Sequence, residues 1–168
     1  AATGACEHTL AGHHEAVWSA SFCPKGDKIV TASNDRTARV WNAATGACEH
    51  TLAGHDGGVY SASFCPKGDK IVTASADRTA RVWNAATGAC EHTLAGHDGG
   101  VRSASFCPKG DKIVTASDDR TARVWNAATG ACEHTLAGHD GAVMSASFCP
   151  KGDKIVTASY DHTARVWN

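Results

Sequence analysis

Residues that could do chemistry recur at fixed places along this chain of 168 residues. His13 and Asp35 stand near two hydroxyl side chains, Thr31 and Ser33, and these are the residue types of a hydrolase triad. Such a triad needs an exposed nucleophile and an oxyanion site, normally in one copy. Here the same set occurs four times. We therefore expect a structural role for these residues, and we expect the protein not to be an enzyme.

A second candidate for chemistry is the pair formed by Cys6 and His8, which also recurs in every copy. Residues two apart point to the same face of a strand, so this pair could capture a stray metal ion. A zinc site needs three or four protein ligands, and the pair offers two. We expect no functional metal and no other cofactor.

These sets recur because the whole chain is a repeat. Four units of 42 residues, at 1–42, 43–84, 85–126 and 127–168, account for all 168 residues. Of the 42 columns, 36 are identical in the four copies and six differ. A repeat of this length is typical of solenoids and propellers, whose units stack because none can bury its apolar face alone. We expect one domain over residues 1–168.

The elements that would position these residues are short strands. In the first repeat, residues 5–10, 17–22, 28–33 and 37–41 each suit a strand, and Pro24 and Gly26 mark a turn between two of them. The strand at 17–22 is rich in Ala and Ser, which indicates that strands from several units converge there. No segment has helical periodicity. The fold class is therefore all-β, with four short strands in each repeat.

Composition excludes some classes of partner. The 16 basic and 17 acidic residues give a net charge of −1, which argues against binding to nucleic acid or to anionic membranes. No apolar run approaches the length of a membrane span, and the first residues do not resemble a signal peptide. The eight cysteines, two per repeat, are expected to be free thiols. Together these features favour a cytoplasmic location.

A Gly12-His13 pair, a turn Asp35 and a strand-closing Trp41 recur in each unit. This set resembles the WD-repeat β-propeller family, and the resemblance covers all four units. One departure is that Asn42 follows the tryptophan where the family usually has Asp. The resemblance implies four-stranded antiparallel blades around a central channel. Near-identical copies also resemble recently amplified repeat arrays, a fragment of such an array, or a designed symmetric propeller.

The resemblance also implies a hydrogen-bond network in each blade. The Trp41 indole would bond the hydroxyl of Thr31 or Ser33, with Thr31 favoured, and that hydroxyl would meet His13, which would meet Asp35. The network residues are His13, Thr31, Asp35 and Trp41; His55, Thr73, Asp77 and Trp83; His97, Thr115, Asp119 and Trp125; and His139, Thr157, Asp161 and Trp167.

Four blades are too few to close a ring of the family's usual size. We expect two chains to form an eight-bladed ring with two-fold symmetry, because the apolar faces at the ends of each arc would otherwise be exposed. In this arrangement, residues 5–10 of one chain would complete the last blade of the other.

The six variable columns cluster around two loops, those near residues 14–18 and 34–36. One interpretation is a recognition surface for a protein or peptide on a fixed scaffold, since Trp, Tyr and Arg are common at binding hot spots. The other is harmless variation at exposed positions, in an excised or designed module without a native ligand. We favour recognition. The candidate partner-binding residues are Trp18, Tyr60, Arg102, Met144, Asn34, Ala76, Asp118, Tyr160, Glu15, Arg36 and His162.

Overall fold

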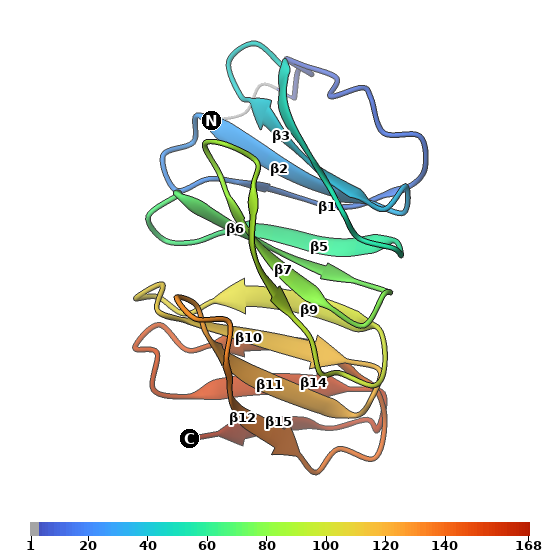
Figure 1. The fold of residues 1–168 in the computed structure, drawn as a ribbon, viewed down its shortest axis with the longest axis vertical. Coiled ribbons are helices and arrows are strands. Elements are labelled where there is room, and N and C mark those ends of the chain that lie inside the picture. The colour runs from blue at the N-terminus through green and yellow to red at the C-terminus, as the bar shows by residue number, and fades with distance from the viewer. Residues whose placement is uncertain (1–3) are drawn as a thin grey trace.

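The computed structural model describes residues 4–168 and is all-β, as expected from the sequence (Figure 1). Its strands are β1 (Val17–Phe22), β2 (Lys28–Ser33), β3 (Thr37–Asn42), β4 (Cys48–Ala53), β5 (Val59–Phe64), β6 (Lys70–Ser75), β7 (Ala80–Asn84), β8 (Cys90–Leu94), β9 (Val101–Phe106), β10 (Lys112–Ser117), β11 (Thr121–Asn126), β12 (Cys132–Ala137), β13 (Val143–Phe148), β14 (Ile155–Ser159) and β15 (Ala164–Trp167).

These strands form four antiparallel sheets, in the orders β1-β2-β3-β4, β5-β6-β7-β8, β9-β10-β11-β12 and β13-β14-β15. Each sheet corresponds to one blade. The blades follow one another from the blue end of the molecule to the red end and do not close into a ring (Figure 1). The chain is therefore an open arc with two free ends.

Each complete blade takes its outer strand from the following sequence repeat. β4 begins at Cys48, in the second repeat, and pairs with β3 of the first. The expectation of a strand at residues 5–10 is wrong for the first copy, because no strand of the described chain lies beside it to share its backbone hydrogen bonds. For the same reason the last sheet has three strands, so the expectation of four strands in every blade fails there.

The innermost strands β1, β5, β9 and β13 lie next to one another along the arc. Their small residues allow this convergence. The Ser21 hydroxyl donates to the Ala62 carbonyl at 3.2 Å, and the Ala62 amide donates to the Ser19 hydroxyl at 3.2 Å. Hydroxyls thus join neighbouring blades where a larger side chain would separate them.

The core lies between successive blades. Val30, Val40 and Leu52 of the first blade pack with Val59 and Ile71 of the second, and all five side chains are fully buried. Equivalent clusters join the second blade to the third and the third to the fourth. Each blade therefore contributes one apolar face to the neighbour before it and one to the neighbour after it.

At the two ends of the arc these faces lie open. Val156 and Val166 on the last blade are 44% and 69% exposed, although the equivalent residues Val30 and Val40 are fully buried. On the first blade, Val17 is 51% exposed, whereas its equivalent Val59 is buried. The arc therefore ends in two apolar faces of the kind that it buries everywhere else.

Candidate functional site

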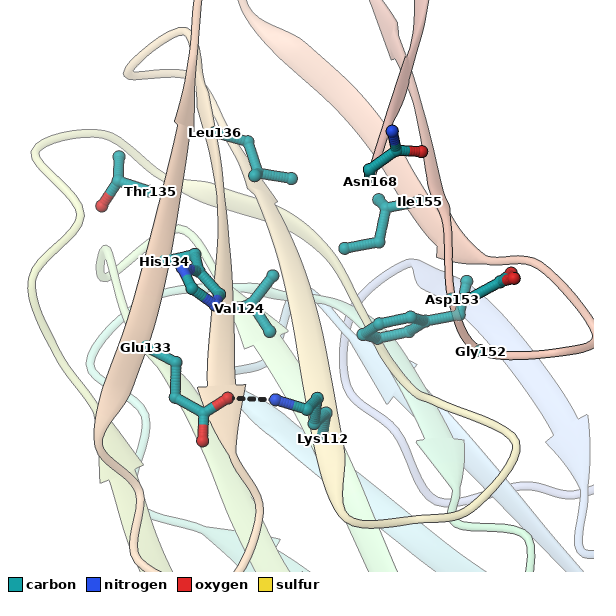
Figure 2. Close-up of a pocket in the computed structure, with 11 residues that line it drawn as sticks. Lys112, Val124, Glu133, His134, Thr135, Leu136, Gly152, Asp153, Ile155 and Asn168 are labelled. Carbon is teal, nitrogen blue, oxygen red and sulfur yellow. Dashed lines mark hydrogen bonds and ion pairs between the residues drawn. The ribbon is translucent and has the colours of Figure 1, made fainter.

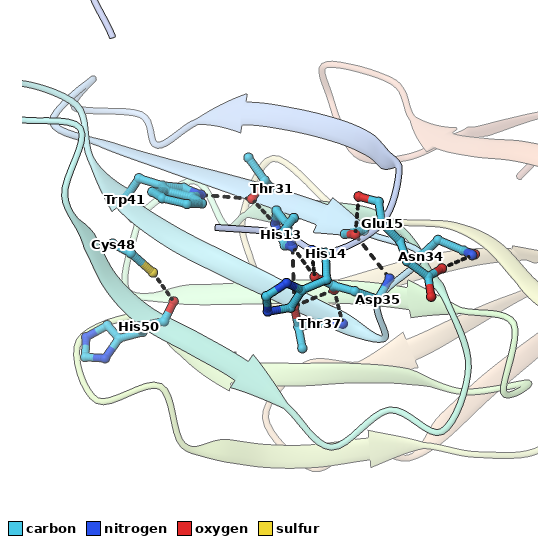
Figure 3. A network of polar contacts seen from close by, with 11 residues as sticks. His13, His14, Glu15, Thr31, Asn34, Asp35, Thr37, Trp41, Cys48 and His50 are labelled. Carbon is cyan, nitrogen blue, oxygen red and sulfur yellow. Dashed lines mark hydrogen bonds and ion pairs between the residues drawn. The ribbon is translucent and has the colours of Figure 1, made fainter. Parts of the chain in front are cut away.

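Four side chains in the first blade form one hydrogen-bonded chain (Figure 3). The Trp41 indole Nε1 donates to Thr31 Oγ1 at 2.9 Å, and Thr31 Oγ1 lies 2.7 Å from His13 Nε2. His13 Nδ1 lies 2.8 Å from Asp35 Oδ2. Of the two hydroxyls that the sequence left open, the indole uses Thr31. Ser33 instead donates to the Glu15 carbonyl and accepts the Asp35 amide.

One proton arrangement satisfies every member of this chain. Since the carboxylate of Asp35 can only accept, His13 donates from Nδ1 and its Nε2 accepts the Thr31 hydroxyl proton. The Thr31 oxygen is then free to accept the Trp41 N–H. A second proton on His13 would leave the Thr31 hydroxyl proton without its acceptor. The network therefore requires a neutral histidine.

The same contacts recur in the other three blades. The histidine-to-aspartate distances are 2.7 Å for His55–Asp77, 2.6 Å for His97–Asp119 and 2.6 Å for His139–Asp161. The histidine-to-threonine distance is 2.8 Å for His55–Thr73, His97–Thr115 and His139–Thr157. The indoles of Trp83, Trp125 and Trp167 donate to those threonines at 2.9 Å.

The surroundings set the charge state of the network. Burial raises the pKa of Asp35, but hydrogen bonds from Thr37 and His13 outweigh burial and hold that pKa well below its usual range. Burial lowers the pKa of His55 and of His97, and their hydrogen bonds to aspartate offset only part of this effect. In the second and third blades, an ionised aspartate beside a neutral histidine is therefore the stable form at neutral pH.

The threonine hydroxyl in this network is not placed to act as a nucleophile. Thr31 is 4% exposed and Thr73 is fully buried, and each hydroxyl already carries two hydrogen bonds. The network instead ties the loop before β1 to the β2–β3 hairpin, because His13, Thr31 and Asp35 come from those segments. It fixes the packing of the blade.

One of the two columns with four different residues in the four copies lies on a β-bulge. The register between β1 and β2 shifts between Val17 and Ser19, so Trp18 has no partner in the ladder. The same shift leaves Tyr60, Arg102 and Met144 unpaired in their blades. A bulge turns its extra residue out of the sheet pattern. This explains how one column accepts four side chains of different shape without disturbing the ladder.

The four bulge residues converge on one pocket of about 400 Å³, which Asn34 also lines. We call these five residues, Trp18, Asn34, Tyr60, Arg102 and Met144, the rim pocket. The rings of Trp18 and Tyr60 meet edge to face with centroids 6.2 Å apart, and the Arg102 guanidinium lies 4.8 Å from the Tyr60 centroid. Arg102 Nε also donates to Asp118 Oδ1 at 2.8 Å. The pocket thus combines aromatic surface with one oriented cation.

The other candidate residues surround this pocket or lie apart from it. Asp118 orients Arg102 from behind, and Glu15 accepts a hydrogen bond from the Asn34 side chain. Tyr160 is 68% exposed, and neither it nor Ala76 lines the pocket.

Arg36 and His162 sit in turns with φ of 69° and 67°, the left-handed region that few residues with side chains adopt. Their column is therefore constrained by the backbone as well as by any partner.

Backbone hydrogen bonds place the two variable loops side by side. The Asn34 amide donates to the Ala16 carbonyl at 2.9 Å, and the equivalent bonds recur in the other blades. The neighbouring blade contributes as well, because a Cβ on Gly58 would lie 2.5 Å from the Asn34 side-chain oxygen. The variable loops of successive blades therefore form one continuous edge of the arc.

A second hollow of about 450 Å³ lies between the third and fourth blades, where the last sheet lacks its outer strand. We call it the edge groove. Figure 2 shows Leu136 on one side and Ile155 and Asn168 on the other, with the ion pair between Lys112 and Glu133 below. The repeat pattern does not reveal this hollow, because the hollow depends on how the three-stranded last sheet packs against β12.

Neither a metal-binding cluster nor a membrane-spanning helix is found in the described part of the chain. Residues 4–168 contain no group of three or more His, Cys, Asp or Glu side chains that could hold a metal ion. The Cys6 thiol instead contacts the His8 carbonyl at 3.5 Å. Within the same residues, no helix could span a lipid bilayer.

The chain is similar to known proteins in two ways. Residues 4–42, 46–84, 88–126 and 130–168 each match the family described as WD domain, G-beta repeat. A segment of 37 residues is 46% identical to the Notchless protein homolog of Arabidopsis thaliana, covering 22% of this chain and 8% of that protein. Four family matches that together span nearly all of the chain, with the Trp–Thr–His–Asp network in each blade, show that the chain belongs to the WD40 repeat family.

Proposed function

We propose that this chain is a non-enzymatic scaffold that binds a protein or peptide at the rim pocket, and that two chains together form the working eight-bladed ring. The observation that carries the binding proposal is the convergence of Trp18, Tyr60, Arg102 and Met144 on one pocket. In four otherwise near-identical repeats, one column with four different residues lines this cavity in every copy. WD40 repeats imply a protein-interaction role, which supports the same proposal.

The two open faces of the arc support the ring. The last blade exposes Val156 and Val166, and the first blade exposes Val17 and Phe22. Between the first two blades, the equivalent residues pack against one another. When one face of a chain binds a different face of the next copy, the copies form a closed ring if the rotation that relates them leads back to the first copy. Two arcs of four blades give eight, within the usual range for propellers.

The chemistry of the rim pocket suggests the kind of ligand. Arg102 is its one cationic lining residue, and no carboxylate lines it. Trp18, Tyr60 and Met144 offer aromatic and polarisable apolar surface. A volume of about 400 Å³ is within the range of ligand pockets and suits a few side chains rather than a whole domain. We infer a protein segment in which an acidic side chain stands beside an aromatic or aliphatic one.

We also propose that the protein acts in the cytoplasm, without nucleic acid, membrane or cofactor as a partner. The eight cysteines are free thiols, which suits a reducing compartment. The balance of 16 basic and 17 acidic residues supports the absence of electrostatic attraction to polyanions.

The binding proposal is tested with two pools of synthetic heptapeptides that share apolar flanking positions and carry Asp or Asn at the centre. We expect immobilised protein to retain the Asp pool about tenfold more strongly than the Asn pool. Replacing Trp18, Tyr60, Arg102 and Met144 together by Ala should abolish retention and leave thermal stability nearly unchanged. Lys109→Gln, on an exposed turn outside the rim pocket, is the matched control. Equal retention of both pools, or a large loss of stability in the fourfold variant, would contradict the proposal.

A further inference from the structure

We propose that residues 5–10 of one chain pair with the open edge of β15 in a second copy, as the fourth strand of its last blade, with Glu7 paired to Lys154 across the junction. This inference rests on the proposed two-chain ring and adds the pairing register and the ion pair that join the chains. The edge of β15 is open, and the segment that pairs with the equivalent edge in every other blade is present at the start of the chain.

The pairing register follows from the complete blades. In the third blade, Ala122 faces Leu136, Val124 faces His134 and Trp125 faces Cys132. The first and second blades have the same register. Moved on by one repeat, this register sets Ala164 against Leu10, Val166 against His8 and Trp167 against Cys6 of the second copy. Every residue in the transferred pairing is identical to its counterpart in the blades where the pairing is seen.

One ion pair recurs along the outer edge and is incomplete at both ends of the chain. Lys28 pairs with Glu49, Lys70 with Glu91 and Lys112 with Glu133, each glutamate standing 21 residues after its lysine. Within residues 4–168, Lys154 has no such glutamate and Glu7 has no such lysine. If the first repeat of a second copy continues the arc after the last repeat of the first copy, Glu7 of the second copy takes the position 21 residues after Lys154.

The incoming segment already lies where the junction needs it. Cys6, Glu7, His8 and Leu10 line a hollow with Phe22 and Ile29 of the first blade. The edge groove brings together the equivalent residues Glu133, His134, Leu136, Phe148 and Ile155. Residues 6–10 therefore pack against the first blade of their own chain in the same way that β12 packs against the fourth blade.

Two contacts of His8 support this placement. The ring of His8 lies against Gly46, as His50 lies against Gly88 and His92 against Gly130. Its Nε2 also lies 2.9 Å from the Ala44 carbonyl. Docking of a second copy would place β15 beside residues 6–10 and give their backbone groups a strand to pair with.

The Lys154–Glu7 pair gives a test by charge exchange. Glu7→Lys alone puts two lysines at each junction of a ring, and Lys154→Glu alone puts two glutamates there. An equal mixture of the two variants restores one lysine and one glutamate at both junctions. Both positions are exposed in the single chain, so each variant keeps its fold. Glu49→Lys, which breaks an ion pair within one chain, is the matched control.

Dissociation constants for self-association are measured by light scattering over a dilution series, and native mass spectrometry of differently tagged variants identifies mixed pairs. We expect each single variant to associate about tenfold more weakly and the mixture to form mixed pairs with the original affinity. The control should change the constant by less than about twofold. Pairs that form at statistical ratios with unchanged affinity would overturn the strand exchange and leave the ring standing. Monomers at every concentration, in the unsubstituted chain as well, would overturn the ring itself.

Discussion

The guanidinium carbon of Arg102 lies 4.8 Å from the centre of the Tyr60 ring, although the two residues belong to different blades. Asp118 holds the other side of this contact through the Arg102 Nε. The hydrogen bond to Asp118 raises the pKa of Arg102, so its charge is permanent. The variable residues therefore touch one another across blades and act as a connected surface.

This contact predicts the effect of Arg102→Met, which removes the charge and keeps an unbranched apolar side chain. The preference for the Asp peptide pool over the Asn pool should disappear, because the one cation of the rim pocket is lost. Retention of the apolar part should remain measurable, since Trp18 and Tyr60 are unchanged. A variant that still prefers the Asp pool would show that another group binds the carboxylate.

The buried network predicts a graded response at Thr73. Thr73→Val keeps the shape but leaves the Trp83 indole and His55 without their shared partner, and should lower the free energy of unfolding by about 2–4 kcal/mol. Thr73→Ser keeps the hydroxyl and should cost about 1 kcal/mol through the lost methyl group. Urea denaturation measures both. Equal effects of the two variants would show that packing, and not the hydrogen bonds, is what matters.

The pKa shifts predict that acid weakens the fold in two stages. The pKa of His55 is lowered from 6.5 in the folded state, so the unfolded chain binds more protons as the pH falls below about 6.5, and stability decreases. The pKa of Asp77 is lowered from 3.8, because hydrogen bonds from Thr79 and His55 outweigh the effect of burial, which raises it. A second loss of stability therefore follows below about pH 4.

Thermal unfolding between pH 3 and 8 measures both stages. His55→Gln, which cannot take up this proton, should reduce the step near pH 6.5, with His97 keeping its share, and should spare the step near pH 4. A stability that is constant from pH 8 to pH 5 would contradict the neutral histidine.

The turn at Arg120 predicts a gain of stability on substitution. Its φ is 72°, a conformation that costs most side chains about 1 kcal/mol and costs glycine almost nothing. Arg120→Gly should therefore raise the free energy of unfolding by about 0.5–1 kcal/mol, and Arg120→Val should lower it. Calorimetry compares the two variants, and an equal loss from both would mean that the arginine side chain makes an important contact.

Much of this structure could be predicted from the sequence because local pattern and repetition agree. Strands such as β1 and β2 begin and end at the expected residues, since Pro24 and Gly26 stop one and the next starts with Lys28. The choice of Thr31 over Ser33 needed the known network of the family, because both hydroxyls lie on the same face of a strand.

The features that the sequence did not reveal depend on contacts between repeats. The bulge at Trp18 leaves no mark on the alternation of polar and apolar residues. Residues 6–11 have the same sequence as β4, but no neighbouring strand of the described chain pairs with them. They form no strand, because a strand depends on its partner as well as on its residues. The left-handed turn at Arg36 is hidden because arginine is not a usual residue for that conformation.

The mass in solution of the 168-residue chain, measured by light scattering across a range of concentrations, tests the two-chain ring most directly. Two arcs that cover each other's open faces should give a compact particle with twice the mass of one chain. A compact particle with the mass of a single chain, folded at every concentration, would contradict it.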